Sequence, residues 1–233
     1  MNYYCLIAGL PDIHAEDTKT TISMLEFKSE LLEELSASDT ELLKLVFANY
    51  DNTNFLAYLN NKDAELNPLG NLNSNDWGQL LALMQELENP YDKRLLPYIQ
   101  KFYHTFGNEK ENAEGVLNVD YLSGLYYEYA MQSSNSFLRN WYEFNLNINN
   151  ILSASACRKH GFDQRIMVLG NNEVALAIKA SNARDFGLTG LFEQLDIVLR
   201  IADENDLLER EKKIDALKWA WLEENTFFSY FSI

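Results

Sequence analysis

The clearest pattern in the chain is a helical one between Phe137 and Gly161. Apolar or small side chains recur there at alternating steps of four and three residues, which places them on one face of a helix. These side chains are Phe137, Trp141, Phe144, Ile148, Ile151 and Ser155. The alternation predicts one long helix, and Gly161 is suited to cap its C-terminal end.

Polar side chains crowd around this apolar face. They include Glu143, Asn145, Asn147, Asn149 and Asn150. Asn forms helices poorly because its amide competes for backbone hydrogen bonds. We therefore expect some of these amides to bind partners outside the helix and to hold helix to helix within a bundle.

Shorter helices are expected along the rest of the chain. Ser23 and Glu26 have the spacing of a capping box, and Ser38 and Glu41 repeat it. We expect a break at 51–54, and an extended N-terminal segment before the turn at Gly9 and Pro11. Further helices are expected at 77–88, from Pro97, from about Asp120, and at 172–180, 191–202 and 204–224. Strand alternation is nearly absent, so we expect an all-α fold of several small helical bundles packed side by side.

Two polar, turn-rich segments divide the chain. Asn60–Asn75 contains Pro68 and Gly70, and Gly107–Gly115 is charged and nearly free of apolar residues. We therefore expect one helical subunit over 1–233, with sub-bundles at 1–70, 71–110 and 116–233.

The net charge of the chain limits the classes of partner that it can bind. The formal net charge is −16, with 35 Asp and Glu against 19 Lys and Arg, so the average surface repels phosphate backbones and anionic headgroups. We expect no nucleic-acid partner and no direct membrane insertion, because no stretch approaches the ~20 apolar residues that a spanning helix needs. A basic patch of Arg158, Lys159 and Arg165 could meet an acidic partner, although cations near a helix C-terminus are the simpler interpretation. Two isolated cysteines and the absence of a leader favour the cytoplasm.

Residues capable of catalysis are sparse. The chain has no phosphate-binding loop and no nucleophile elbow. Cys157, His160 and Asp163 have a possible metal-ligand spacing, but an ordinary helix end explains them better. Asp203, Glu204 and Asp206 could act as paired carboxylates, but a helix start explains them better. We expect no catalytic residue, no metal and no cofactor.

Three stretches together carry a family resemblance: YYCLIAGLPDI at the start, WYEFNLNINNIL in the middle and EREKKIDALKWAWLEENTFFSYFS at the end. The chain resembles the C subunit of V-type and A-type ATP synthases, the counterpart of the d subunit in vacuolar ATPases. It is most similar to a bacterial branch catalogued as a domain of unknown function.

The resemblance implies a non-catalytic, funnel-like helical subunit that joins the membrane rotor ring to the central shaft of a rotary ATPase. Its partners would be the rotor-ring membrane subunits and the central-shaft subunits, and it would be peripheral to the membrane through that complex. The family's pattern of an acidic residue, an apolar residue and an Asn is matched by Glu143, Phe144 and Asn147. Our candidate interhelical polar residues are Glu143, Asn145 and Asn147. The alternatives are an all-α, metal-assisted hydrolase and a helical adaptor unrelated to ATPases.

The C-terminus departs from the family pattern, because the family's chains usually continue further. We therefore expect the last bundle to be incomplete, with several aromatic side chains exposed. These are Phe227, Phe228, Tyr230 and Phe231.

Overall fold

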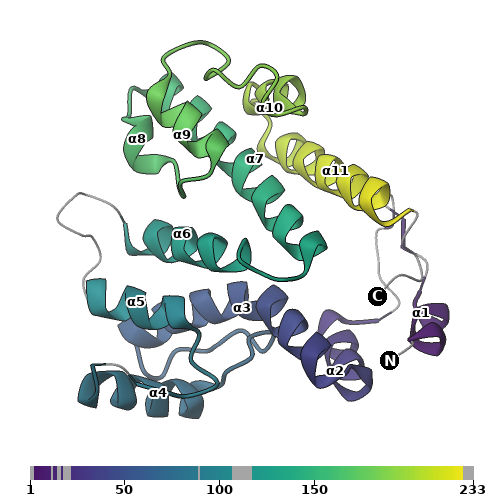
Figure 1. Ribbon diagram of the computed structural model, residues 1–233, viewed down its shortest axis with the longest axis vertical. Helices are drawn as coiled ribbons and strands as arrows, with labels where there is room; N and C mark the ends of the chain where they lie inside the picture. Colours follow the sequence, from purple (N-terminus) through teal and green to yellow (C-terminus); the bar gives the residue numbers. More distant parts are fainter. Residues whose placement is uncertain are drawn as a thin grey trace. The chain divides into compact units, whose positions relative to one another are not determined.

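The computed structural model describes residues 3–11, 13, 14, 17, 22–88, 90–106 and 117–227. Within these residues it has eleven helices and no strand, so the predicted all-α class is confirmed (Figure 1). The chain divides into two compact units. Unit 1 comprises Met1–Arg94 with Trp219–Ile233, and unit 2 comprises Leu95–Lys218. The division into sub-bundles at 1–70, 71–110 and 116–233 stays a prediction.

Unit 1 contains four complete helices: α1 (Tyr4–Gly9), α2 (Met24–Glu34), α3 (Ala37–Asn60) and α4 (Ser74–Glu86). The predicted capping box at Ser23 and Glu26 is confirmed, because each side chain bonds the other's backbone amide. A second box, Asn73 with Asp76, starts α4. α4 packs on α3 through Trp77 and Phe55, whose ring centres lie 4.8 Å apart.

Three expectations for unit 1 were wrong. The N-terminal segment is helical over α1 rather than extended. α3 begins after Ser36, which accepts a bond from the Asp39 amide, so the start lies two residues before the predicted Ser38. The expected break at 51–54 does not exist, because α3 continues through it to Asn60.

Two polar residues of this segment, Asp51 and Asn54, are buried and bind the loop that precedes α4. Asp51 is 4% exposed, and its Oδ1 accepts hydrogen bonds from the backbone amides of Asn71 (2.7 Å) and Leu72 (3.1 Å). Asn54 bonds both the amide (2.7 Å) and the carbonyl (2.9 Å) of Asn67. These buried side chains find their own partners in the backbone of the loop, which explains why they can lie inside a helix.

Unit 2 contains the helices from α5 onward: α5 (Pro97–Phe106), α6 (Asn118–Ala130), α7 (Ser136–His160), α8 (Gln164–Met167), α9 (Glu173–Ala180), α10 (Leu195–Ala202) and most of α11 (Leu207–Thr226). α5 and α6 lie side by side, and α7 contacts α6, α8, α9 and α10 (Figure 1). The predicted long helix is therefore the central element of the unit. It ends at Gly161 in the left-handed conformation (φ 74°), as expected.

Some expectations concern residues outside those described. The segment 107–115 and the side chains of Phe228, Tyr230 and Phe231 are among them. Phe227 is described and is 75% exposed. None of the described helices is long and apolar enough to cross a lipid bilayer.

Candidate functional site

The candidate site is the polar side of α7, which faces the segment from Leu169 to Asn172. Glu143, Asn147 and Asn150 are spaced by four and three residues, so they share one side of the helix. Asn147 is 6% exposed and Asn150 is 1% exposed. Buried amides are costly unless they are hydrogen-bonded, so the partners of these two side chains decide what the site does.

Asn172 connects two of these positions to the start of α9. Its Nδ2 donates to Asn147 Oδ1 at 2.8 Å and lies 3.3 Å from Glu143 Oε1. Its own Oδ1 accepts a hydrogen bond from the Ala175 amide at 3.1 Å, which caps the N-terminus of α9. One side chain therefore caps α9 and ties that helix to α7.

Asn150 makes the most complete contact of the site. Its Nδ2 donates to the Leu169 carbonyl at 2.8 Å, and its Oδ1 accepts from the Leu169 amide, also at 2.8 Å. Both halves of the amide are matched to one residue's backbone, as in a pair of neighbouring β-strands. This contact fixes the chain between α8 and α9 against the middle of α7.

Two further asparagines of α7, Asn145 and Asn149, have other partners. Asn145 Nδ2 donates to the Trp141 carbonyl at 2.7 Å, four residues back in the same helix, rather than to another helix. Asn149 is exposed and donates to the Tyr127 hydroxyl on α6 at 3.0 Å. Sequence reasoning selected Asn145 and did not single out Asn150, because a run of asparagines carries no signal that says which amide meets a loop.

Tyrosines add a second polar link between α6 and α7. The Tyr126 hydroxyl donates to the Tyr142 hydroxyl at 2.8 Å, and both residues are buried. Burial raises the pKa of Tyr142 to about 12 and also raises the pKa of Tyr126. Both hydroxyls therefore stay protonated at neutral pH and act as hydrogen-bonding groups rather than as acids or bases.

The three acidic residues considered for catalysis lie immediately before α11 and in the turn that precedes it. Asp206 Oδ1 accepts from the amides of Leu208 (2.9 Å) and Glu209 (3.2 Å), which is the helix-start role that the sequence favoured. Glu204 forms an ion pair with Lys213. Asp203 follows the last residue of α10.

The possible metal ligands have separate surroundings. Cys157 is buried, and that burial raises the pKa of its thiol. Asp163 caps α8 through the Arg165 amide at 2.9 Å. Over the described ranges, no three His, Cys, Asp or Glu side chains are placed to hold one metal ion.

The site is therefore a set of amide contacts that fix α7 to its neighbours. Neither a search of curated proteins nor a search of solved structures found a match to this chain. One family model matches residues 1–233, and its description is "Protein of unknown function (DUF2764)". Because that match covers the whole chain, the protein belongs to the DUF2764 family.

Proposed function

We propose that the protein is a non-catalytic central-stalk subunit of a rotary V-type or A-type ATPase, located in the cytoplasm and peripheral to the membrane through that complex. It would couple the membrane rotor ring to the central shaft. The proposal starts from the resemblance of the three stretches in the sequence to the central-stalk C subunit of these enzymes.

The observation that carries the proposal is the way in which α7 is fixed. A coupling subunit transmits torque, so slack between its helices would waste rotation. Asn147 and Asn150 are buried in α7 and bind residues 172 and 169 through 2.8 Å hydrogen bonds. Such contacts favour one packing of the helices over alternatives, which is what a rigid connector requires.

The charge of the chain is compatible with this role. With a formal charge of −16, the protein would be attracted to basic loops on a ring or shaft subunit. Electrostatic attraction of this kind speeds association and selects the partner more than it sets the final affinity.

The test is a mild-detergent purification from the native membrane with a tag at the N-terminus, followed by mass spectrometry of the retained proteins. The control is an identically tagged unrelated protein expressed at the same level. We expect a small two-helix membrane subunit and central-shaft subunits in the first preparation only. Recovery of the protein without them would overturn the proposal, and a different constant partner would identify a helical adaptor instead.

A further inference from the structure

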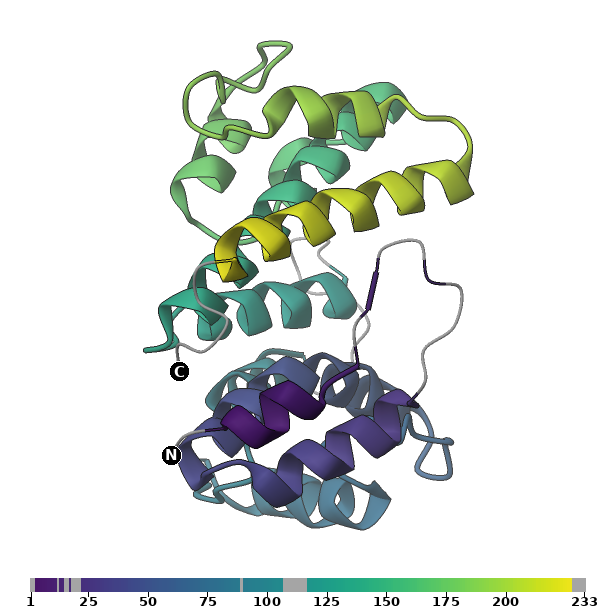
Figure 2. The same cartoon turned by 90° about the vertical axis from the view of Figure 1, so that its right-hand side faces the viewer.

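A groove lies within unit 2 at the C-terminal end of α7. Its walls are the last two turns of α7, the loop at 184–186, α10, the turn at 203–205 and the first two turns of α11. Figure 2 shows α10 (green) joined to the start of α11 (yellow) by this short turn. The groove has a volume of about 760 Å³, which is enough to receive several side chains of a partner.

Part of the lining is apolar. Leu152, Leu199 and Ala202 are half-buried there, and Ile214 is buried. Leu207 also lines the groove and is 64% exposed. An apolar lining with an exposed leucine favours an occupant that buries apolar side chains of its own.

The balance of basic and acidic residues in the lining differs from that of the whole chain. Four of the 19 Lys and Arg residues line the groove, against three of the 35 Asp and Glu residues. One of those acids, Glu204, forms an ion pair with Lys213, which is not part of the lining. The lining therefore carries a small net positive charge of +1 on a protein whose net charge is −16, and Asp203 and Glu211 are the acids that remain beside Glu204.

One of the four cations holds the wall in place. Arg158 donates to the carbonyls of Arg184 (2.9 Å) and Ala183 (2.7 Å), and its guanidinium carbon lies 4.0 Å from the centre of the Phe186 ring. Neutral carbonyls and an aromatic face satisfy its hydrogen bonds but do not cancel its charge.

The other three cations are Lys159, Arg184 and Arg210. Over the described ranges, Lys159 and Arg184 have no carboxylate within 4.0 Å, and Arg210 has only Glu211, at 4.0 Å. The helix dipole explains a lysine at the end of α7. It does not explain Arg184, which lies on a loop, or Arg210, which lies in the first turn of α11, where a cation is unfavourable.

From this combination we infer that the groove binds an amphipathic, acidic helix of a partner protein. An apolar stripe on that helix would lie against Leu152, Leu199 and Ile214, and its carboxylates would meet Lys159, Arg184 and Arg210. A helix laid into a groove is a recurrent mode of recognition, and complementary charge selects the partner. The inference does not depend on the identity of the complex to which the chain belongs.

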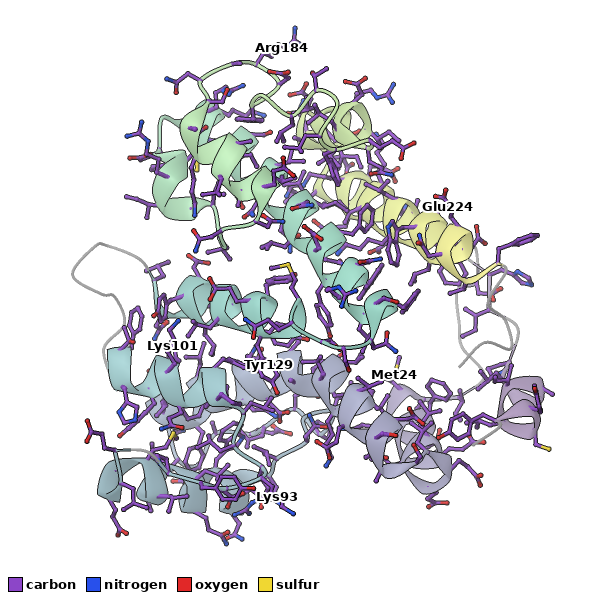
Figure 3. All side chains as sticks on the ribbon, viewed as in Figure 1. Met24, Lys93, Lys101, Tyr129, Arg184 and Glu224 are labelled. Carbon is purple, nitrogen blue, oxygen red and sulfur yellow. The ribbon has the colours of Figure 1, made fainter. Side chains whose placement is uncertain are left out.

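The experiment uses the purified full chain and a fluorescein-labelled synthetic helix with leucines on one face and glutamates along both edges. A second peptide has every glutamate replaced by glutamine, so it keeps the shape and loses the charge. Fluorescence anisotropy gives the affinity of each peptide. The test variant is Lys159→Gln with Arg184→Gln, and the matched control is Lys93→Gln with Lys101→Gln, which removes two exposed cations outside the groove (Figure 3).

We expect the wild type to bind the glutamate peptide more tightly than the glutamine peptide. The test variant should lose roughly fivefold in affinity for the glutamate peptide, since each exposed ion pair is worth a few tenths to about 1 kcal/mol. The control variant should bind as the wild type does, and circular dichroism should show both variants folded. Equal binding of the two peptides, no saturable binding of the glutamate peptide, or equal losses in the two variants would overturn the inference.

Discussion

The contact between Asn150 and the Leu169 backbone gives the sharpest prediction. The change is Asn150→Leu, which keeps a similar volume but removes both polar atoms of the amide. The Leu169 amide and carbonyl would then lose the partners that now lie 2.8 Å away. Asn149→Leu is the matched control, because it is the same chemical change at the neighbouring position, which is exposed and has one hydrogen bond to the Tyr127 hydroxyl.

The magnitude follows from the number of groups left without partners. Each lost hydrogen bond removes about 1 kcal/mol, and each buried polar group left unpaired costs about 1–3 kcal/mol. Leu169 is half-buried, so water reaches it in part and the lower end of that range applies. We expect the free energy of unfolding to fall by about 2–4 kcal/mol for Asn150→Leu and by less than about 1 kcal/mol for Asn149→Leu. For a chain of this length, the first value corresponds to a loss of about 4–16 °C in Tm.

Thermal unfolding followed by circular dichroism and by calorimetry measures both variants against the wild type. Asn150→Ala, which also leaves a cavity, should be at least as destabilised as Asn150→Leu. If Asn150→Leu melts within about 1 °C of Asn149→Leu, while Asn150→Ala is strongly destabilised, side-chain volume rather than the amide contact holds the segment. That result would rule out the Asn150 amide as the group that fixes Leu169 to α7.

Three further predictions concern other polar contacts. Asn147→Leu removes the acceptor of the Asn172 side-chain Nδ2, so Tm should fall by about 2–4 °C. An unchanged melting curve with unchanged assembly would show that Asn147 does not hold α9 to α7. Gly70→Ala would place a Cβ atom 2.4 Å from Asn54 Nδ2 and 2.9 Å from Asp51 Oδ1, so urea denaturation should show a loss of about 1–3 kcal/mol, and wild-type stability would contradict the close approach. Burial raises the pKa of Asp51 above its usual value, so the folded state binds its proton more tightly and the carboxyl's contribution to stability falls as pH rises above about 3.8. The difference in unfolding free energy between wild type and Asp51→Asn should therefore shift against the wild type between about pH 4 and about pH 7, and a difference independent of pH would contradict the raised pKa.

The sequence predicted the elements that are specified by local chemistry. The capping box at Ser23, the proline in the first turn of α5 and the glycine that ends α7 each act within a few residues of chain. The apolar face of α7 was predicted just as directly from the spacing of its residues, and Ile148 and Ile151 on that face are fully buried. Such signals need no knowledge of what lies across the helix.

The wrong prediction of a break at 51–54 arises because the partners of these side chains lie far away in the sequence. Asp and Asn favour turns when their side chains bond nearby backbone, which makes a run of them resemble a break. In α3 the side chains of Asp51 and Asn54 bond a loop 13 to 21 residues later in the chain. Only the tertiary structure shows that these groups are better satisfied inside a helix.

The candidate site, too, was predicted where local sequence specifies it and missed where distant contacts do. Sequence reasoning placed the polar residues on α7 but could not say that Asn150 meets Leu169, 19 residues away. Of the predicted patch of Arg158, Lys159 and Arg165, the first two line the groove and Arg165 does not. Arg184 and Arg210 come from a loop and another helix, and nothing in their local sequence indicates that they line the same groove.

We propose above that the protein couples shaft rotation to the membrane ring. The most direct measurement compares ATP hydrolysis with ATP-driven ion transport in inverted membrane vesicles from cells with the gene, without it, and with it restored. If the protein is the coupling subunit, its loss should abolish ion transport while ATP hydrolysis by the catalytic head persists, and restoring the gene should recover transport. Unchanged ion transport per ATP hydrolysed in vesicles without the protein would show that it is not the coupling subunit.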